Sequence, residues 1–345
     1  MAIGPHLLAA IAGQGGVKVP GAPGTLSLAA GDPATTVITL SWSAPSDTGG
    51  GTVSGYRIKK DGSVLVADTG STGTTYSATG LTASTSYNFN VAAINEKGTG
   101  ADGNTPSLTT GAPFSASGGT ETTYSGYKSH TFTGSGSFVV SGSAGDVDIL
   151  VVAGGGSGSP WGDSYAGGGG GAGGMQTSTS VSATVGSHSI TVGAGGSGVL
   201  PAYPGGVPDG ADSSGLSVTS TGGGRGGSAD SGTAGGRFQS QDGGSGGGTR
   251  VASGDAAPGQ GTSGQGNDGG SGAFTTVLFS CWVVAAGGGG GKGAVGATGT
   301  ANCSSAWGAG DGGAGAVNAY KTGSNITYAG GGGGADDIYG GWGGG

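Results

Sequence analysis

Alternating hydrophobic and polar positions predict short β-strands in the first third of the chain. In TTVITLSWSAP, the odd positions from Val37 to Ser41 alternate with Ile38, Leu40 and Trp42. The stretch SGYRIKKDGSVLVADTG supplies two strands around Asp61-Gly62, a dipeptide typical of tight hairpin turns. Strands of this length, regularly spaced over residues 20–112, predict a β-sandwich.

Several residues of this block, in order and spacing, resemble fibronectin type III domains. Trp42 stands where that family buries its core tryptophan, and Tyr56 opens the third strand. The segment GLTASTSYNFNVAAIN is similar to the family's leucine and tyrosine-corner segment, which would contain Leu81 and Tyr87. The resemblance implies that these four residues belong to the core. It also implies a spacer or docking module, although such a fold does not by itself give a function.

After residue 112 the pattern changes to hairpins and glycine. Residues 113–145 alternate aromatic and polar positions and predict a β-hairpin connector. Further on, VSATVGSHSITVGAGG predicts a hairpin that turns at Gly186-Ser187. An apolar strand runs into a glycine block three times, at ILVVAGGG (149–156), CWVVAAGGGGG (281–291) and ITYAGGGGG (326–334).

These patterns predict an all-β fold: a fibronectin type III β-sandwich followed by a glycine-rich domain over residues 146–345. Almost no helical periodicity is present. Polyglycine can form polyproline II helices of 3 residues per turn, which pack side by side through backbone contacts. The glycine runs here are short and often interrupted, so both polyglycine II helices and β-strands remain open for this domain.

Composition narrows the classes of function. Of 345 residues 92 are Gly and only 9% are charged, and the net charge of −8 argues against binding to a nucleic-acid backbone. No apolar stretch approaches the ~18–20 residues of a membrane span. Residues 1–19 lack the basic start of a secretory signal. Cys281 and Cys303 fit no zinc spacing, and either a disulfide or two free thiols is open.

Glycine motifs that imitate nucleotide-binding loops fail on inspection. After Gly154 and Gly156 in DVDILVVAGGGSGSP, the third glycine position of a dinucleotide loop is Ser159, and no helix is predicted to follow. In GGGGGKG the residue after Lys292 is Gly293, so the hydroxyl that a phosphate loop uses for Mg²⁺ is missing.

Other catalytic and metal chemistry has equally little support. The histidines lie far apart, and Asp336 and Asp337 point to opposite sides of an extended chain. A single cation at Asp255 or Asp268 stays open, because GQGNDGGSG is similar to one calcium-binding repeat. We therefore expect no enzyme, no cofactor and no assigned metal site.

Aromatic residues concentrate in the stretches between the glycine blocks. If the blocks form a bundle of rods, these stretches become loops at its ends, where exposed aromatic rings stack on sugars or anchor proteins. The alternative is that individual rings are buried as caps of the bundle. The candidate receptor-binding residues are Trp161, Tyr165, Tyr203, Phe238, Trp307, Tyr339 and Trp342.

The region from about 113 to 345 resembles the glycine-rich domains of bacteriophage tail fibres. DVDILVVAGGGSGS, SITVGAGGSG and ITYAGGGGG have the strand-then-glycine phrasing found there. In block-and-loop organisation the region is also similar to the tip adhesins of T-even-like phages, whose loops contact the host receptor.

The resemblance implies a non-enzymatic virion protein of a phage tail, exposed outside cells and assembled in the host cytoplasm. Residues 1–19 would attach it to other tail proteins, and the glycine-rich domain would bind a host polysaccharide or outer-membrane protein. No nucleic acid would be a partner, and a homo-oligomer, commonly a trimer in fibres, would be expected. Alternatives are a capsid-decoration or fibre-shaft protein without receptor contact, and a bacterial cell-surface adhesin.

Overall fold

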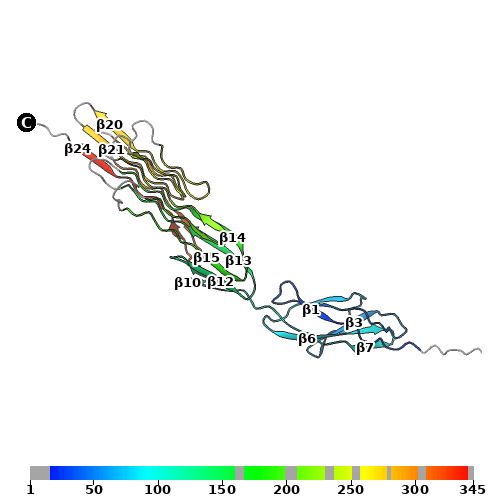
Figure 1. Cartoon of the computed structure of the whole chain (residues 1–345). Coiled ribbons are helices and arrows are strands. Elements are labelled where there is room, and N and C mark those ends of the chain that lie inside the picture. The colour runs from blue at the N-terminus through cyan, green and yellow to red at the C-terminus, as the bar shows by residue number, and fades with distance from the viewer. Residues whose placement is uncertain are drawn as a thin grey trace, which may run out of the picture. The chain divides into compact units, whose positions relative to one another are not determined.

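The chain is all-β and divides into two compact units in a computed structural model (Figure 1). The first unit ends at Phe114 and the second begins at Ser115. The described residues contain no helix, and so none of them forms a helix that could cross a membrane. The structure describes residues 16–159, 167–198, 208–229, 237–250, 257–277, 281–301 and 308–340.

The first unit is a sandwich of two antiparallel sheets. One sheet has the order β1-β2-β5, and the other has the order β4-β3-β6-β7, with β8 also paired to β6. Asp61 and Gly62 both have positive φ (50° and 80°) and form the tight turn predicted between β3 and β4. The strands are β1 (Ser27–Ala30), β2 (Ile38–Ser41), β3 (Gly55–Lys60), β4 (Ser63–Val66), β5 (Thr75–Ala78), β6 (Ser86–Asn95), β7 (Gly98–Asp102) and β8 (Ser107–Thr109).

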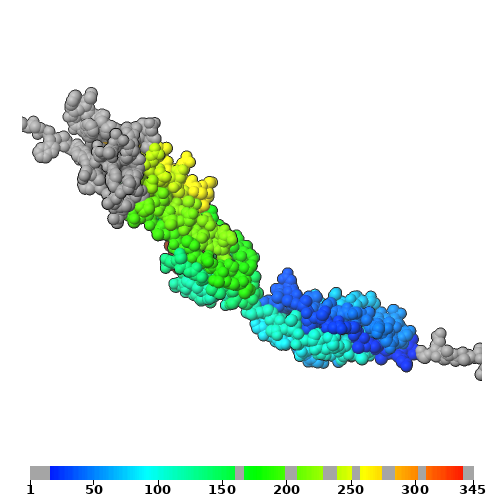
Figure 2. Space-filling view, in the orientation of Figure 1, coloured from blue at the N-terminus to red at the C-terminus, as the bar shows by residue number. Residues whose placement is uncertain are grey.

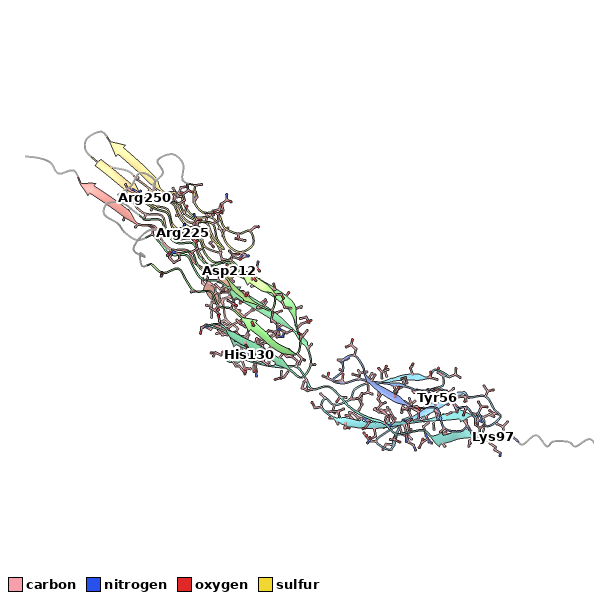
Figure 3. All side chains as sticks on the ribbon, viewed as in Figure 1. Tyr56, Lys97, His130, Asp212, Arg225 and Arg250 are labelled. Carbon is pink, nitrogen blue, oxygen red and sulfur yellow. The ribbon has the colours of Figure 1, made fainter. Side chains whose placement is uncertain are left out.

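The predicted core residues of this sandwich are buried. Trp42, Tyr56, Leu81 and Tyr87 all belong to one hydrophobic cluster, whose position between the strands is marked by Tyr56 in Figure 3. The rings of Trp42 and Tyr56 meet edge to face with centroids 5.1 Å apart. The hydroxyl of Tyr87 accepts a 2.9 Å hydrogen bond from the N–H of Thr82, which is the expected tyrosine-corner contact.

The second unit starts with a small sandwich. Its two sheets have the orders β15-β12-β9 and β13-β14, and an apolar cluster of Phe138, Val140 and Ala183 lies between them. A hairpin, β10-β11, precedes β12. The strands are β9 (Ser115–Ser117), β10 (Thr120–Tyr124), β11 (Tyr127–Thr131), β12 (Gly136–Ser141), β13 (Gly145–Val152), β14 (Met175–Ala183) and β15 (Gly186–Ile190).

The prediction of a hairpin that turns at Gly186-Ser187 is wrong. The two strands exist, but β14 pairs with β13 and β15 pairs with β12, so the turn carries the chain from one sheet to the other. Alternation identifies strands and their apolar faces, but it does not choose between pairing partners. Packing of Ala183 and Ile190 toward Phe138 favours the crossing over a local hairpin.

Beyond these sheets the chain forms extended segments, which we call rods and name by their residues. They are rods 153–159, 167–174, 191–198, 208–212, 221–227, 239–243, 245–250, 257–262, 266–272, 286–291, 295–301, 308–315 and 329–335. Short strands pair between them: β16 (Ser213–Gly215) with β17 (Val218–Ser220), β18 (Ser228–Ala229) with β19 (Arg237–Phe238), β22 (Ala316–Asn318) with β23 (Ile326–Tyr328), and β21 (Cys281–Ala285) with both β20 (Ala273–Val277) and β24 (Asp336–Gly340).

Hydrogen bonds along each rod change direction with a period of three residues. In rod 167–174 every third N–H, at Gly168, Gly171 and Gly174, donates to rod 221–227 at 2.8–3.0 Å. The intervening Gly169 and Ala172 donate to rod 286–291 instead. A repeat of three residues is that of a polyproline II helix, whereas a β-strand would repeat every two. The rods are therefore polyglycine II helices, and this resolves the alternative that the sequence left open.

An inner rod has six neighbours. Rod 286–291 donates to rods 245–250, 295–301 and 329–335 and accepts from rods 167–174, 266–272 and 308–315. These six rods are also bonded to one another in a closed ring, in which neighbours that accept from the central rod alternate with neighbours that donate to it. Figure 2 shows the outside of this packing, where green and yellow segments from distant parts of the sequence share one face.

Glycine is required inside the bundle because the rods touch through their backbones. A Cβ added to Gly246, Gly289 or Gly310 would overlap a carbonyl oxygen of a neighbouring rod. Backbone hydrogen bonds, each worth about 1 kcal/mol net, offset the entropy that glycine loses on folding. Each of the three predicted strand-to-glycine passages leads into such a rod.

Candidate functional site

The glycine bundle has two different ends. One end of the bundle carries β13, β14 and β15, and the other end carries β20, β21 and β24 (Figure 1). Along the chain, rods that run toward β20, β21 and β24 (rising rods) alternate with rods that run back (descending rods). We call the end with β20, β21 and β24 the distal end. The segments outside the described residues between positions 160 and 307 each follow a rising rod or strand and precede a descending one.

Hydrogen bonds join the described residues that flank several of those segments. Ser159 donates to Gly168 at 3.0 Å, so the two ends of segment 160–166 are neighbours. The same layer continues from Gly168 to Gly227 (3.0 Å) and from Gly227 to Gly248 (2.9 Å), next to segments 230–236 and 251–256. The rods therefore hold the described residues that flank several of these segments together in one layer at the distal end.

Five of the seven candidate receptor-binding residues lie outside the described residues: Trp161, Tyr165, Tyr203, Trp307 and Trp342. The other two lie on distal strands. Phe238 is in β19, opposite Ser228, and Tyr339 is in β24, opposite Trp282. Trp282, which belongs to the apolar segment before the second glycine block, was not among the candidate residues.

Polar side chains also join neighbouring rods of the bundle. The N–H of Arg225 donates to the Asp209 carboxylate at 2.9 Å, and the guanidinium lies 3.9 Å from the same carboxylate. Arg225, Arg250 and Asp212 are placed along the rods in Figure 3. Asp268, a candidate cation ligand, accepts a 2.8 Å bond from the N–H of Gly261, and the other candidate, Asp255, lies outside the described residues.

Neither a metal cluster nor a phosphate loop is present in the part of the chain that the structure describes. No group of three or more His, Cys, Asp or Glu side chains comes together there. The N–H groups of Gly154 and Gly156, which imitate a nucleotide loop, donate to Ala211 (3.0 Å) and Gly171 (2.8 Å). These glycines join rods, and their donors are not free for a phosphate.

The first unit carries one clear charged cluster. Asp102 accepts hydrogen bonds from Arg57 (2.8 Å) and Lys59 (2.7 Å) on the β3-β6-β7 sheet. Burial by itself would raise the pKa of Asp102, but the bonds from Lys59 and Arg57 outweigh it and lower the pKa below its ordinary value. Both cations bind the one carboxylate, so the cluster joins β3 to β7 and stabilises the sheet.

Comparison with known families agrees with the two units. The family model of the fibronectin type III domain matches residues 21–110, and that of the glycine-rich domain matches residues 131–345. The chain belongs to the glycine-rich domain family. Its N-terminal unit is a fibronectin type III β-sandwich. A fibronectin type III domain joined to a glycine-rich domain indicates a structural or adhesive protein.

Among solved structures, similarity is limited to a part of this chain. Titin kinase with its flanking domains is 25% identical over 27% of this chain and 17% of its own, with a TM-score of 0.24. The twitchin kinase region from C. elegans is 24% identical over 27% and 17% (TM-score 0.23). The sixth fibronectin type III domain of the human fibronectin type III domain containing protein 3 is 24% identical over 28% and 92% (TM-score 0.24). The chain thus spans less than a fifth of the two kinase structures.

Proposed function

We propose that this protein is a non-enzymatic component of a phage tail, in a tail fibre or at the tail tip, that binds the host cell surface through the distal end of its glycine-rich domain. The observation that carries the proposal is that residues next to segments 160–166, 230–236 and 251–256 lie in one hydrogen-bonded layer of the polyglycine II bundle. A rigid scaffold that presents several short loops together is a common design for recognition.

The composition of those loops supports a surface ligand. Trp161, Tyr165, Tyr203, Trp307 and Trp342 belong to segments whose flanking described residues lie at the distal end. Flat aromatic rings bind polysaccharides by stacking and bind outer-membrane proteins as anchors. In this proposal the fibronectin type III domain is a spacer or dock, and residues 1–19 attach the protein to other tail proteins. Several copies per particle, as in a trimeric fibre, would multiply weak contacts.

Adsorption of purified protein to host cells tests the proposal. We expect the full chain to bind cells and a chain that ends at residue 114 to lose binding, because the first compact unit ends there. Full binding by the truncated chain would contradict the assignment of receptor binding to the glycine-rich domain.

A second comparison separates loop recognition from a role in packing alone. Replacement of both Trp161 and Trp342 by Ala should weaken adsorption and leave the unfolding temperature unchanged. Normal adsorption of a folded double variant would favour the alternative in which these rings only cap the bundle.

A further inference from the structure

One rod of the bundle has an incomplete ring of neighbours. Rod 167–174 is bonded in sequence round its circumference to rods 153–159, 221–227, 245–250, 286–291 and 329–335, each joined to the next. No hydrogen bond between described residues joins rods 329–335 and 153–159, so the ring is open there. A groove of about 370 Å³ occupies this position, with walls from these two rods and a floor from rod 167–174.

The floor of the groove carries unpartnered backbone donors. Gly170 and Gly173 are buried, and neither N–H donates to a described residue. They are three residues apart and therefore lie on one face of the rod, which is the face that lines the groove. A backbone N–H that loses water without gaining an acceptor costs roughly 1–3 kcal/mol, so an occupant of the groove has to supply acceptors to both donors.

The walls carry the complementary groups. The carbonyl groups of Ala153 and Gly156 on one wall and of Gly330 and Gly333 on the other accept no backbone bond from a described residue. Around rod 167–174, neighbours that donate hydrogen bonds to it alternate with neighbours that accept from it. The open position lies between rods 153–159 and 329–335, which both donate to rod 167–174, so a rod at this position would accept from it. The free donors of Gly170 and Gly173 are those that a further rod at this position would receive.

Glycine in the walls has no explanation within the chain itself. A Cβ on Gly155 or Gly158 would come no closer than 3.6 Å to other atoms, and one on Gly332 no closer than 3.4 Å. These are ordinary contacts, unlike the overlaps at interior glycines. All three Cβ positions would face the N–H groups of Gly170 or Gly173, at 3.5–3.8 Å. Because these three residues have no side chain, the groove stays open.

We propose that this groove binds an extended, glycine-rich segment of another protein in the polyproline II conformation, as an additional rod. At ~3.1 Å rise per residue and ~4.8 Å between hydrogen-bonded chains, the groove has room for about six residues. The partner's carbonyl groups would accept from Gly170 and Gly173, and its N–H groups would donate to the walls. The proposal is independent of receptor binding by the distal loops.

The direction of the hydrogen bonds favours a segment of a different protein as the occupant of the groove, and disfavours a wall rod from a second copy of this chain. Each wall offers acceptors to the groove, so the occupant must donate to both walls. If the rod 329–335 of a twofold-related copy entered the groove, the same acceptor faces would oppose each other. A separate glycine-rich segment has no such restriction.

A labelled peptide of Gly-Gly-Ser repeats, titrated with the full chain and followed by fluorescence anisotropy, tests the proposal. We expect saturable binding, about tenfold weaker in Gly332→Val because the side chain fills the groove over Gly170. Gly158→Val should do the same from the opposite wall. Gly198→Val is the matched control, since a Cβ on Gly198 would have no atom within 4 Å and its rod, 191–198, does not line the groove. An Ala-Ala-Ser peptide of equal length should not bind.

Three results would overturn the proposal. The first is that the glycine peptide shows no saturable binding. The second is that wild type and Gly332→Val bind it equally, with an unchanged circular dichroism spectrum of the variant. The third is that the alanine peptide binds as well as the glycine peptide. Sedimentation of the chain alone tests whether a second copy of the chain occupies the groove. An oligomer that dissociates in Gly332→Val would show that a second copy fills the groove, against the assignment to another protein.

Discussion

Gly246 lies so close to the carbonyl oxygen of Gly259 that a Cβ on Gly246 would overlap it. The two residues belong to adjacent rods of the polyglycine II bundle, and Gly246 also donates to Asn267 at 3.0 Å. Backbone contact at this distance is possible only without a side chain. The stability of the glycine-rich domain therefore depends on individual glycines in the way that other domains depend on core side chains.

Gly246→Ala should destabilise the glycine-rich domain by about 1–3 kcal/mol, because the added methyl group forces the rods apart. Differential scanning calorimetry would show a lower transition for this domain and an unchanged one for the fibronectin type III domain. The control is Gly195→Ala, whose Cβ would have an ordinary contact of 3.6 Å with Gly155. Equal melting of both variants would contradict backbone contact as the source of stability.

Segment 160–166 should be replaceable by a short Gly-Ser linker without loss of folding. Its flanking residues are already neighbours, since the N–H of Ser159 donates to Gly168 at 3.0 Å. We expect an unchanged melting temperature and reduced adsorption to host cells. Ser217→Gly, in the turn between β16 and β17 at the opposite end, is the control and should adsorb normally because Gly readily adopts the positive φ of 66°. Loss of folding with the linker would show that the segment stabilises the bundle.

Tyr87→Phe should lower the melting temperature of the fibronectin type III domain by about 5 °C, because the N–H of Thr82 loses its acceptor. The hydrogen bonds with Thr82 also lower the pKa of Tyr87, so a tyrosine that titrates early in ultraviolet absorbance should disappear in the variant. Tyr76→Phe is the control, since Tyr76 packs against the same core and its hydroxyl has no hydrogen bond with described residues. Equal effects of the two substitutions would argue against the tyrosine-corner contact.

The fibronectin type III domain should lose stability in acid through Asp102. Because Lys59 and Arg57 lower its pKa in the folded state, the stabilisation is present above the unfolded pKa, near 4, and is lost as the pH falls through the folded value. We expect Asp102→Asn to cost about 1 kcal/mol or less at pH 7 and to reduce the acid sensitivity in urea unfolding. Glu96→Gln removes the same charge elsewhere and should leave the acid dependence as in wild type.

For the first unit, local sequence carried most of the structure. Trp42, Tyr56, Leu81 and Tyr87 are buried as the resemblance to fibronectin type III domains implied, and Asp61-Gly62 forms the turn that the sequence predicted. In a sandwich each strand buries one face, and successive side chains of a strand point to opposite faces. The hydrophobic residues at every second position therefore identify the core.

The glycine-rich domain is different, because glycine has no side chain to mark an inner or outer face. The sequence determined that residues 146–345 would form glycine segments that follow strands, and it marked the aromatic stretches between them. It could not show which rods are neighbours, that residues next to segments 160–166, 230–236 and 251–256 share one layer, or that β14 and β15 enter different sheets. Gly155, Gly158 and Gly332 read like every other glycine in the printed sequence. Only the tertiary structure separates glycines that prevent a clash from glycines that keep a groove open, since that depends on backbone hydrogen bonds between residues far apart in the chain.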